Sequence, residues 1–320
     1  MGMAATRLRK RWAITLARLF TKVFCIQTDP VSMLAADRPS SLSRHTILQI
    51  AATLPADLRV LSKLAELLRD VNSELSDIGA LLRCDVALAA KVVRISNSPV
   101  FGGGRSISSP DEAVNLVGFS EILKLVGTAT AGRLSESSLQ CYDIGATLLR
   151  NNMLYGAFAA EALARPAGID PRLAYSAGLL RSVGLMVLDR VGRGDAATAP
   201  LYSPSRWPDY PTWERCVFGI TSCEVTAILL EEWQFPADVS DAIRAHYITD
   251  PEDQERPLAV LLNVANGMAQ RVSRSFRGED SLWEITSEKL SAAGLSVADF
   301  EPAIMATEES FDAATEALAF

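Results

Sequence analysis

The stretch RISNSPVFGGGRSISSPDEAVNLVG, residues 94–118, joins a run of turn-forming residues to a clear helix start. Asn97 and Ser98 belong to residue types that cap or brace turns, and the three glycines that begin at Gly102 permit backbone angles closed to other residues. These glycines do not form a phosphate-binding P-loop, because no Gly-Lys-Ser/Thr sequence opens a helix after them. We therefore interpret the segment as a structural loop between two helices.

The helix after this loop begins with a capping box. Ser109 supplies the capping hydroxyl, Pro110 takes the first helical position and Glu112 the third. Gly118 then breaks the helical pattern, and a further helix is expected over 121–132.

Apolar residues recur at helical spacing on both sides of this region. Helices are expected over 56–70, 78–84, 86–96, 144–163, 171–191, 223–233, 237–247 and 257–272. The alternating pattern of β-strands is essentially missing. The sequence therefore predicts an all-α fold.

The segment 192–211 is the one long irregular stretch, and aromatic residues gather in and just after it. They are Tyr202, Trp207, Tyr210 and Trp213. Two interpretations remain open, a loop whose aromatics fold back onto the helices and an exposed surface that docks a partner.

The charge of the chain is unevenly distributed. The 320 residues carry a formal charge of −7, of which residues 1–30 contribute +5 and the remainder −12. Nucleic-acid binding is disfavoured, because phosphate contacts need clustered Lys and Arg. Five scattered cysteines without a Cys-x-x-Cys pair favour neither a disulfide framework nor a zinc site, so a reducing, cytoplasmic compartment is expected.

Residues 7–24, which begin with Arg7 and end with Phe24, predict a basic amphipathic helix. Three uses are open: packing on the acidic body of the protein, docking on a partner, or lying on an anionic membrane surface. No stretch is apolar enough to cross a bilayer, and we expect the segment to be retained rather than cleaved as a signal peptide.

The motif in residues 94–118 resembles that of the bacterial HDOD family, signalling output domains related to the HD phosphohydrolases. Arg94, Asn97, Ser98 and Gly102 stand at the motif positions, with Ile-Ser-Ser after the glycines. Similarity continues in segments 54–57, 177–180, 225–233 and 242–244. The resemblance implies one all-α HDOD domain over residues 48–275, preceded by the basic segment 1–25 and a linker 26–47 and followed by an acidic helical extension, 276–320.

The HD phosphohydrolases hold metal with a His, an adjacent His-Asp pair and a later Asp, often with further histidines. The resemblance places Asn151 at the first position, Arg181 and Ser182 at the pair, Ser222 at a later histidine and Asn266 at the closing Asp. Amides and hydroxyls bind divalent metals poorly, and an arginine repels them. We therefore expect no metal, no cofactor and no catalytic residue.

Two interpretations of Arg181 remain open. With Asn151 and Ser182 it converts the cation site into a polar-ligand or anion pocket, or it pairs with an acid such as Glu224 and fixes helix positions. His246 is the one histidine near these positions, and we interpret it as structural rather than as a ligand.

The sequence thus predicts a cytoplasmic, non-enzymatic bacterial signalling protein that binds a protein partner or a regulatory ligand. Two rival functions are a divergent metal-dependent phosphohydrolase acting on a nucleotide and a membrane-peripheral adaptor that uses residues 7–24.

Overall fold

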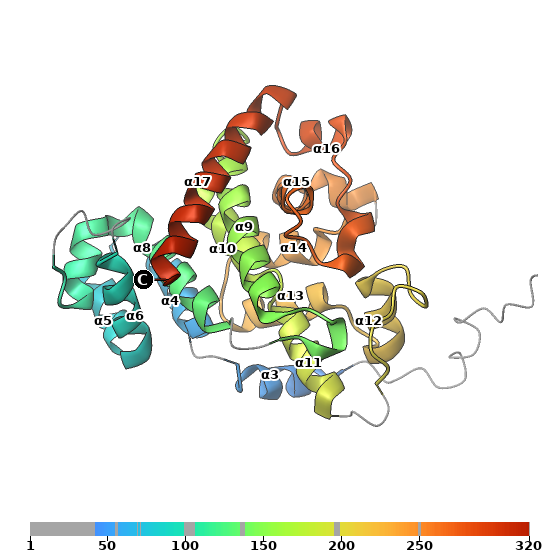
Figure 1. The fold of residues 1–320 in the computed structure, drawn as a ribbon, viewed down its shortest axis with the longest axis horizontal. Coiled ribbons are helices and arrows are strands. Elements are labelled where there is room, and N and C mark those ends of the chain that lie inside the picture. Colours follow the sequence, from blue (N-terminus) through green and yellow to red (C-terminus); the bar gives the residue numbers. More distant parts are fainter. Residues whose placement is uncertain are drawn as a thin grey trace, which may run out of the picture. The chain divides into compact units, whose positions relative to one another are not determined.

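The computed structural model describes residues 42–54, 57–68, 70, 72–98, 106–134, 138–194, 199–248 and 251–319 (Figure 1). They lie in one compact unit, Ser41–Phe320. The α-helices are, in chain order, α3 (Arg44–Ala51), α4 (Asp57–Leu67), α5 (Leu75–Arg83), α6 (Val86–Ser96), α8 (Pro110–Leu134), α9 (Ala146–Ala164), α10 (Pro171–Leu180), α11 (Val183–Gly194), α12 (Tyr210–Phe218), α13 (Ser222–Glu232), α14 (Ala237–Ala245), α15 (Pro257–Arg271), α16 (Ser287–Ala292) and α17 (Phe300–Ala319). Short 3₁₀ helices are η1 (Gln140–Tyr142), η2 (Pro251–Glu255), η3 (Arg277–Leu282) and η4 (Val297–Asp299).

The all-α prediction is confirmed, because the described residues form helices and no β-strand. The one β-type pairing found in these ranges is an isolated bridge between Leu139 and Ile144. Most predicted helices lie within a few residues of their expected bounds, and α6 matches its predicted range. Helix α12 was not predicted, because its first residues fall in the irregular segment 192–211.

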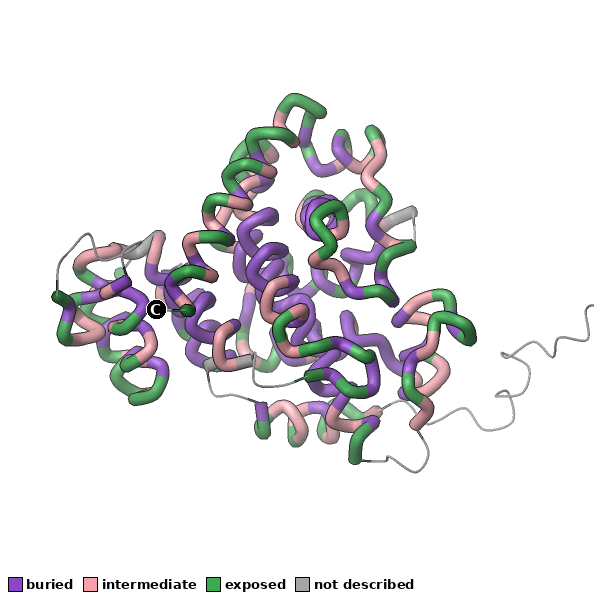
Figure 2. The backbone as a smooth tube through the Cα atoms, in the orientation of Figure 1, coloured by how far each residue is buried: buried purple, intermediate pink, exposed green. Residues whose placement is uncertain are grey.

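Helix α9 runs through the core and is buried over most of its length (Figure 2). It packs against α8, α10, α15 and α17, as expected for a helix that is apolar on nearly every face. A Cβ added to Gly178 of α10 would lie 2.5 Å from the carbonyl oxygen of Gly156 in α9. The two glycines therefore let the backbones of α9 and α10 approach closely, which fixes the end of α10 inside the core.

Helix α8 breaks at Gly118, as predicted. This residue has φ 73° and ψ −179°, a conformation that glycine adopts at little cost. Before the break, Ser109 Oγ accepts from the Glu112 N–H at 3.1 Å, whereas the Glu112 carboxylate accepts from Ser108 N–H rather than from Ser109. The helix start is therefore as predicted, with the return bond of the capping box shifted by one residue.

The predicted single helix over 171–191 is wrong, because a turn at Arg181 and Ser182 separates α10 from α11. Helix α11 packs so closely on α13 that a Cβ added to Gly184 would lie 1.9 Å from the Ser222 carbonyl oxygen. A continuous helix would carry α11 away from this contact. The turn instead places Arg181 and Ser182 at a junction between packed helices.

The aromatic residues of the irregular segment fold back onto the helices. Tyr202, Trp207, Tyr210 and Trp213 are each less than a tenth exposed. They pack around Tyr142 of η1, whose ring centroid lies 4.8 Å from that of Trp213 in an edge-on contact. The Trp213 indole N–H also donates to the Pro200 carbonyl oxygen at 3.0 Å. These side chains are part of the core. The interpretation in which the aromatic residues fold back onto the helices is therefore correct for them.

The C-terminal helix α17 packs along α9, and Figure 1 shows the two crossing. Arg274 stabilises this contact. Its guanidinium lies 3.0 Å from the Glu308 carboxylate of α17 and stacks over the rings of Tyr155 and Phe311. Residues 276–319 therefore share the core of the domain that precedes them.

Helix α3 begins at Arg44, inside the range predicted as linker, and pairs with Glu231 and Glu232 of α13. The predicted basic helix, residues 7–24, and Gly102 lie outside the described residues. Across the described helices, none is long and apolar enough to span a bilayer.

Candidate functional site

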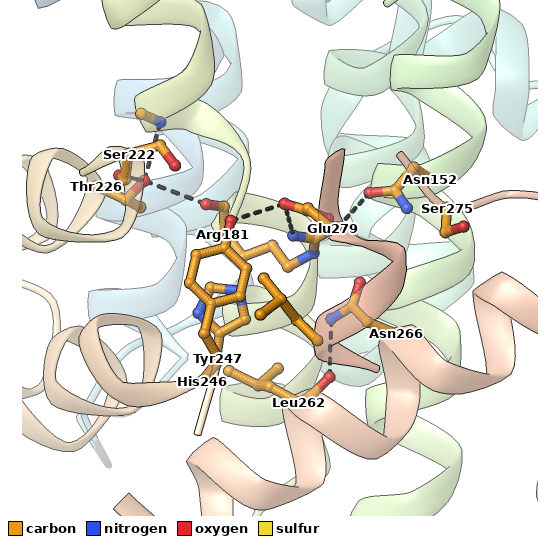
Figure 3. A network of polar contacts seen from close by, with 12 residues as sticks. Asn152, Arg181, Ser222, Thr226, His246, Tyr247, Leu262, Asn266, Ser275 and Glu279 are labelled. Carbon is orange, nitrogen blue, oxygen red and sulfur yellow. Dashed lines mark hydrogen bonds and ion pairs between the residues drawn. The ribbon is translucent and has the colours of Figure 1, made fainter. Parts of the chain in front are cut away.

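Arg181 and Glu279 form a buried ion pair in the core (Figure 3). Guanidinium atoms Nη1 and Nη2 each lie 3.1 Å from a different oxygen of Glu279, which makes the pair bidentate. The two side chains are 1% and 0% exposed. Nη2 also donates to Asn152 Oδ1 at 2.7 Å. The positive charge at the position expected for a His-Asp pair is therefore matched by an internal carboxylate.

The members of this network come from separate parts of the chain. Asn152 lies on α9, and its amide nitrogen donates to the Arg274 carbonyl oxygen at 2.7 Å. Glu279 lies on η3 and also accepts from the Tyr247 hydroxyl at 2.8 Å. Arg181 directly follows α10. The network thus joins the centre of the domain to the segment after α15.

Aromatic rings surround the ion pair. The Arg181 guanidinium carbon lies 5.5 Å from the Phe276 ring centroid and 5.3 Å from that of Trp283, within the range of cation–π contacts. His246 stacks on Tyr247 with ring centroids 4.4 Å apart and on Trp283 at 5.7 Å. This apolar enclosure keeps water from the pair and strengthens the attraction between its charges.

His246 is held in its neutral form. Its Nδ1 lies 2.6 Å from the Ile243 carbonyl oxygen, and because a carbonyl only accepts, Nδ1 must carry the proton. Burial, with the nearby charge of Arg181, lowers the pKa of His246 to about 3. The Nε2 lone pair has no hydrogen-bond partner among the described residues. The Nδ1 atom of His246 therefore has a structural hydrogen bond, whereas Nε2 is an acceptor without a donor among the described residues.

Two further predicted residues lie near the pair and are buried. Asn266 of α15 donates its amide to the Leu262 carbonyl oxygen of its own helix at 2.7 Å, and its Oδ1 has no partner in the described part of the chain. Ser182 is 1% exposed, and its Oγ likewise contacts no polar group there. Neither side chain bonds to the Arg181 guanidinium, so neither takes part in the ion pair.

Ser222 belongs to a second buried carboxylate site. Its N–H and hydroxyl donate to Glu214 Oε2 at 2.7 and 3.1 Å, and the Tyr142 hydroxyl donates to Glu214 Oε1 at 2.8 Å. Glu214 is fully buried, and this burial raises its pKa to about 7 against the opposing effect of these hydrogen bonds. These bonds tie the N-terminus of α13 to α12. One turn further along α13, the Thr226 hydroxyl lies 3.1 Å from the Arg181 carbonyl oxygen, so this end of α13 also contacts the Arg181 backbone (Figure 3).

Asn151 lies apart from the buried network. Its side chain is partly exposed and accepts from Arg150 Nε at 3.3 Å. The neighbouring Asn152 is 1% exposed and supplies the amide that contacts Arg181. One residue of helix register, about 100°, separates the inward-facing amide from the outward-facing one.

The predicted Arg181–Glu224 pair is not formed. Glu224 lies 2.9 Å from Arg215 and caps α13 by accepting from the Thr221 N–H at 2.8 Å. Arg181 does pair with an acid, but that acid is Glu279, 98 residues away. No local pattern marks this partner, since Glu279 lies in the acidic extension that the sequence places outside the domain.

The residues of the family motif lie away from this pair, where Asn97 connects α6 to the start of the next segment. Its amide donates to the Ile107 carbonyl oxygen at 2.8 Å and to a carbonyl one turn earlier in α6 at 3.0 Å, and its Oδ1 accepts from the Ile107 N–H at 2.8 Å. Ser98 is fully buried, and Arg94 is exposed on α6. These contacts suit a structural role for the Asn97 side chain.

The donor set at the site does not fit a divalent metal. His246 Nε2 is the one imidazole nitrogen there, Asn266 offers a neutral amide oxygen, and Arg181 brings a positive charge already bonded to Glu279. In the described ranges no three His, Cys, Asp or Glu side chains are grouped so that they could hold a metal ion. Such ions need several imidazole, thiolate or carboxylate ligands.

The all-helical fold and the Asn97 brace together define a class of protein. The HDOD domain model matches residues 54–249, and the chain belongs to the HDOD family. A curated relative from Treponema pallidum (strain Nichols), recorded as uncharacterized, is 28% identical over 211 residues. The match covers 64% of this chain and 40% of that relative, so this chain spans less than half of the relative's length.

Solved structures share the fold. A candidate signal transduction protein from Marinobacter aquaeolei VT8 has a TM-score of 0.61 and 21% identity, covering 83% of this chain and 59% of that one. A candidate phosphohydrolase from Shewanella amazonensis SB2B has a TM-score of 0.58 and 21% identity, covering 86% and 99%. At this identity the likeness shows the fold alone.

Proposed function

We propose that this protein is a non-catalytic signal-transduction member of the HDOD family, which acts by binding a protein partner or a regulatory ligand. The observation that carries the proposal is the bidentate Arg181–Glu279 pair, because the family resemblance assigns Arg181 to the position of the His-Asp pair in related hydrolases. A buried guanidinium bound to its own carboxylate leaves neither a metal ligand nor a general base at that position. A protein with such a site transmits a state through its packed helices rather than turning over a substrate.

The rival function is that of a divergent metal-dependent phosphohydrolase. It is considered because a structural relative from Shewanella amazonensis is named as a candidate phosphohydrolase. It would require a metal held by His246, Asn266 and Ser222. Ser222 is committed to Glu214, and Asn266 offers only a neutral oxygen, so this ligand set is poor. The observed contacts therefore favour the non-catalytic function.

The two functions are separated by metal content and turnover. Protein purified without chelators from cells grown with added zinc, iron and manganese should contain far less than one equivalent of each metal. With each metal added back, hydrolysis of cyclic dinucleotides should not exceed the buffer blank.

One equivalent of metal per chain, together with turnover, would overturn the proposal if Asn266→Ala abolished both and Asn151→Ala abolished neither. Asn151 is the matched control, because it is the same residue type but is partly exposed and lies away from the network. Circular dichroism of each variant shows that a loss does not reflect unfolding.

A further inference from the structure

A cleft of about 430 Å³ opens where the N-terminal ends of α10, α14 and α15 meet. Its volume lies within the roughly 300–1,000 Å³ typical of ligand pockets. The floor is apolar and only partly covered, formed chiefly by Ile169, Leu173 and Leu258. We call this cleft, with Asp238 and Asp241 of α14 on its rim, the α14 groove.

The rim of the α14 groove carries unused negative charge. Asp238 and Asp241 are one turn apart on α14, and both are exposed. Within the described residues neither forms a hydrogen bond or an ion pair. The third acid of the lining, Asp170, is already bonded to Arg172 and to the start of α10. Two uncommitted carboxylates thus face one cation, Arg256, so the free charge of the groove is negative.

The negative charge of the α14 groove determines which kind of partner can bind there. Anionic partners such as nucleic acids and acidic membrane surfaces are repelled by the two carboxylates and by the formal charge of −12 on residues 31–320. A basic segment is attracted, and one that also carries an aliphatic side chain can cover the apolar floor. Such a combination of an apolar anchor with flanking charges is common in peptide recognition.

The groove is also connected to the buried ion pair. Helix α10 runs from the groove to Arg181, and α14 runs from the groove to His246. An occupant that shifts the N-terminal ends of these helices therefore acts on residues packed in the Arg181 network. This connection is the reason to assign the groove to signalling, and in this respect the inference rests on the proposed function.

We propose that the α14 groove docks a short segment of a partner protein in which an aliphatic side chain is flanked by Lys or Arg. The aliphatic side chain lies on Leu173 and Leu258, and the basic side chains pair with Asp238 and Asp241.

The proposal is tested with synthetic peptides added to the isotope-labelled full chain and followed by NMR. The probe is acetyl-Lys-Leu-Leu-Arg-amide, with acetyl-Glu-Leu-Leu-Glu-amide and acetyl-Lys-Ser-Ser-Arg-amide as controls. The basic aliphatic probe should bind tightest and shift the signals of Leu173, Ala242 and Leu258. Added salt should weaken binding, because the charged rim is exposed to solvent.

The double variant Asp238→Asn/Asp241→Asn should weaken binding of the basic probe about fivefold, as expected for loss of two exposed charge pairs. The matched control is Glu309→Gln/Asp312→Asn, which removes two exposed acids from α17. Equal binding of the acidic peptide, or no effect of the groove variant, would overturn the proposal.

Two other outcomes would also count against it. A change in sedimentation coefficient caused by the groove variant alone would make a second copy of this chain the occupant. Failure of every peptide to bind would remove the groove as a docking site. Neither outcome affects metal content or turnover, so the proposed non-catalytic function would stand or fall separately.

Discussion

Replacing Glu279 by Gln should be among the most destabilising isosteric changes in this protein. The substitution keeps the shape of the side chain and removes the charge that balances Arg181, whose guanidinium is 1% exposed. One oxygen that accepts from Nη2 becomes an NH₂ group, so two donors face each other. Arg181 then keeps a buried positive charge with no carboxylate to balance it, although Asn152 still accepts from Nη2.

The expected magnitude follows from this burial. Breaking a buried ion pair by removing one partner costs about 3–5 kcal/mol, which is a large share of the roughly 5–15 kcal/mol that stabilises a typical domain. Removing both charges in Arg181→Met/Glu279→Gln should recover most of this loss, because the aromatic enclosure accepts an apolar side chain.

Urea unfolding followed by far-UV circular dichroism at neutral pH measures these free energies. The control is Glu66→Gln, which breaks the exposed pair with Lys63, where the side chains are 53% and 61% exposed. It should cost less than about 1 kcal/mol. If Glu279→Gln cost no more than this control, with an unchanged denaturant dependence, the buried pair would not hold the site together.

Three other changes test separate parts of the structure. Asn97→Ala should lower the free energy of unfolding by about 1–3 kcal/mol, because it removes both hydrogen bonds to Ile107. Calorimetry should show a lower melting temperature, and an unchanged melting temperature would contradict the structural role of Asn97. Folding raises the pKa of Glu214 from 4.5 to about 7, so the native state holds a proton that the unfolded state has lost between these values, and stability should fall as pH rises through this window. Glu214→Gln should flatten that dependence in urea titrations, and a profile that kept the wild-type slope would contradict the assignment. Gly184→Ala should destabilise by about 1–3 kcal/mol or more, because its Cβ would meet a carbonyl oxygen at 1.9 Å, whereas Gly145→Ala, with open space around it, should not.

Local features of the fold could be read from the sequence. The helices follow from apolar spacing, and the break at Gly118 follows from a residue that adopts positive φ without strain. The bracing role of Asn97 follows from turn chemistry, since its partner Ile107 is only ten residues away. These features depend on near neighbours, which the sequence displays directly.

The partner of Arg181 could not be found in the same way. Glu279 is 98 residues distant and lies on a short 3₁₀ helix, whose position depends on the packing of α15 and its following turns. The choice between Asn151 and Asn152 depends on helix register, where a shift of one residue turns a side chain by about 100°. The turn after α10 could not be predicted from the local sequence either. It depends on the close contact of Gly184 with α13, which is a contact between residues distant in the sequence.

The proposed function depends on an internal ion pair at the position to which the family resemblance assigns the metal-binding His-Asp pair, and crystals soaked in manganese test it most directly. Anomalous diffraction should show no ion at the site, with both guanidinium nitrogens of Arg181 near 3.1 Å from the Glu279 oxygens. A manganese peak at about 2.0–2.3 Å from His246 Nε2, with Arg181 displaced from Glu279, would contradict the account.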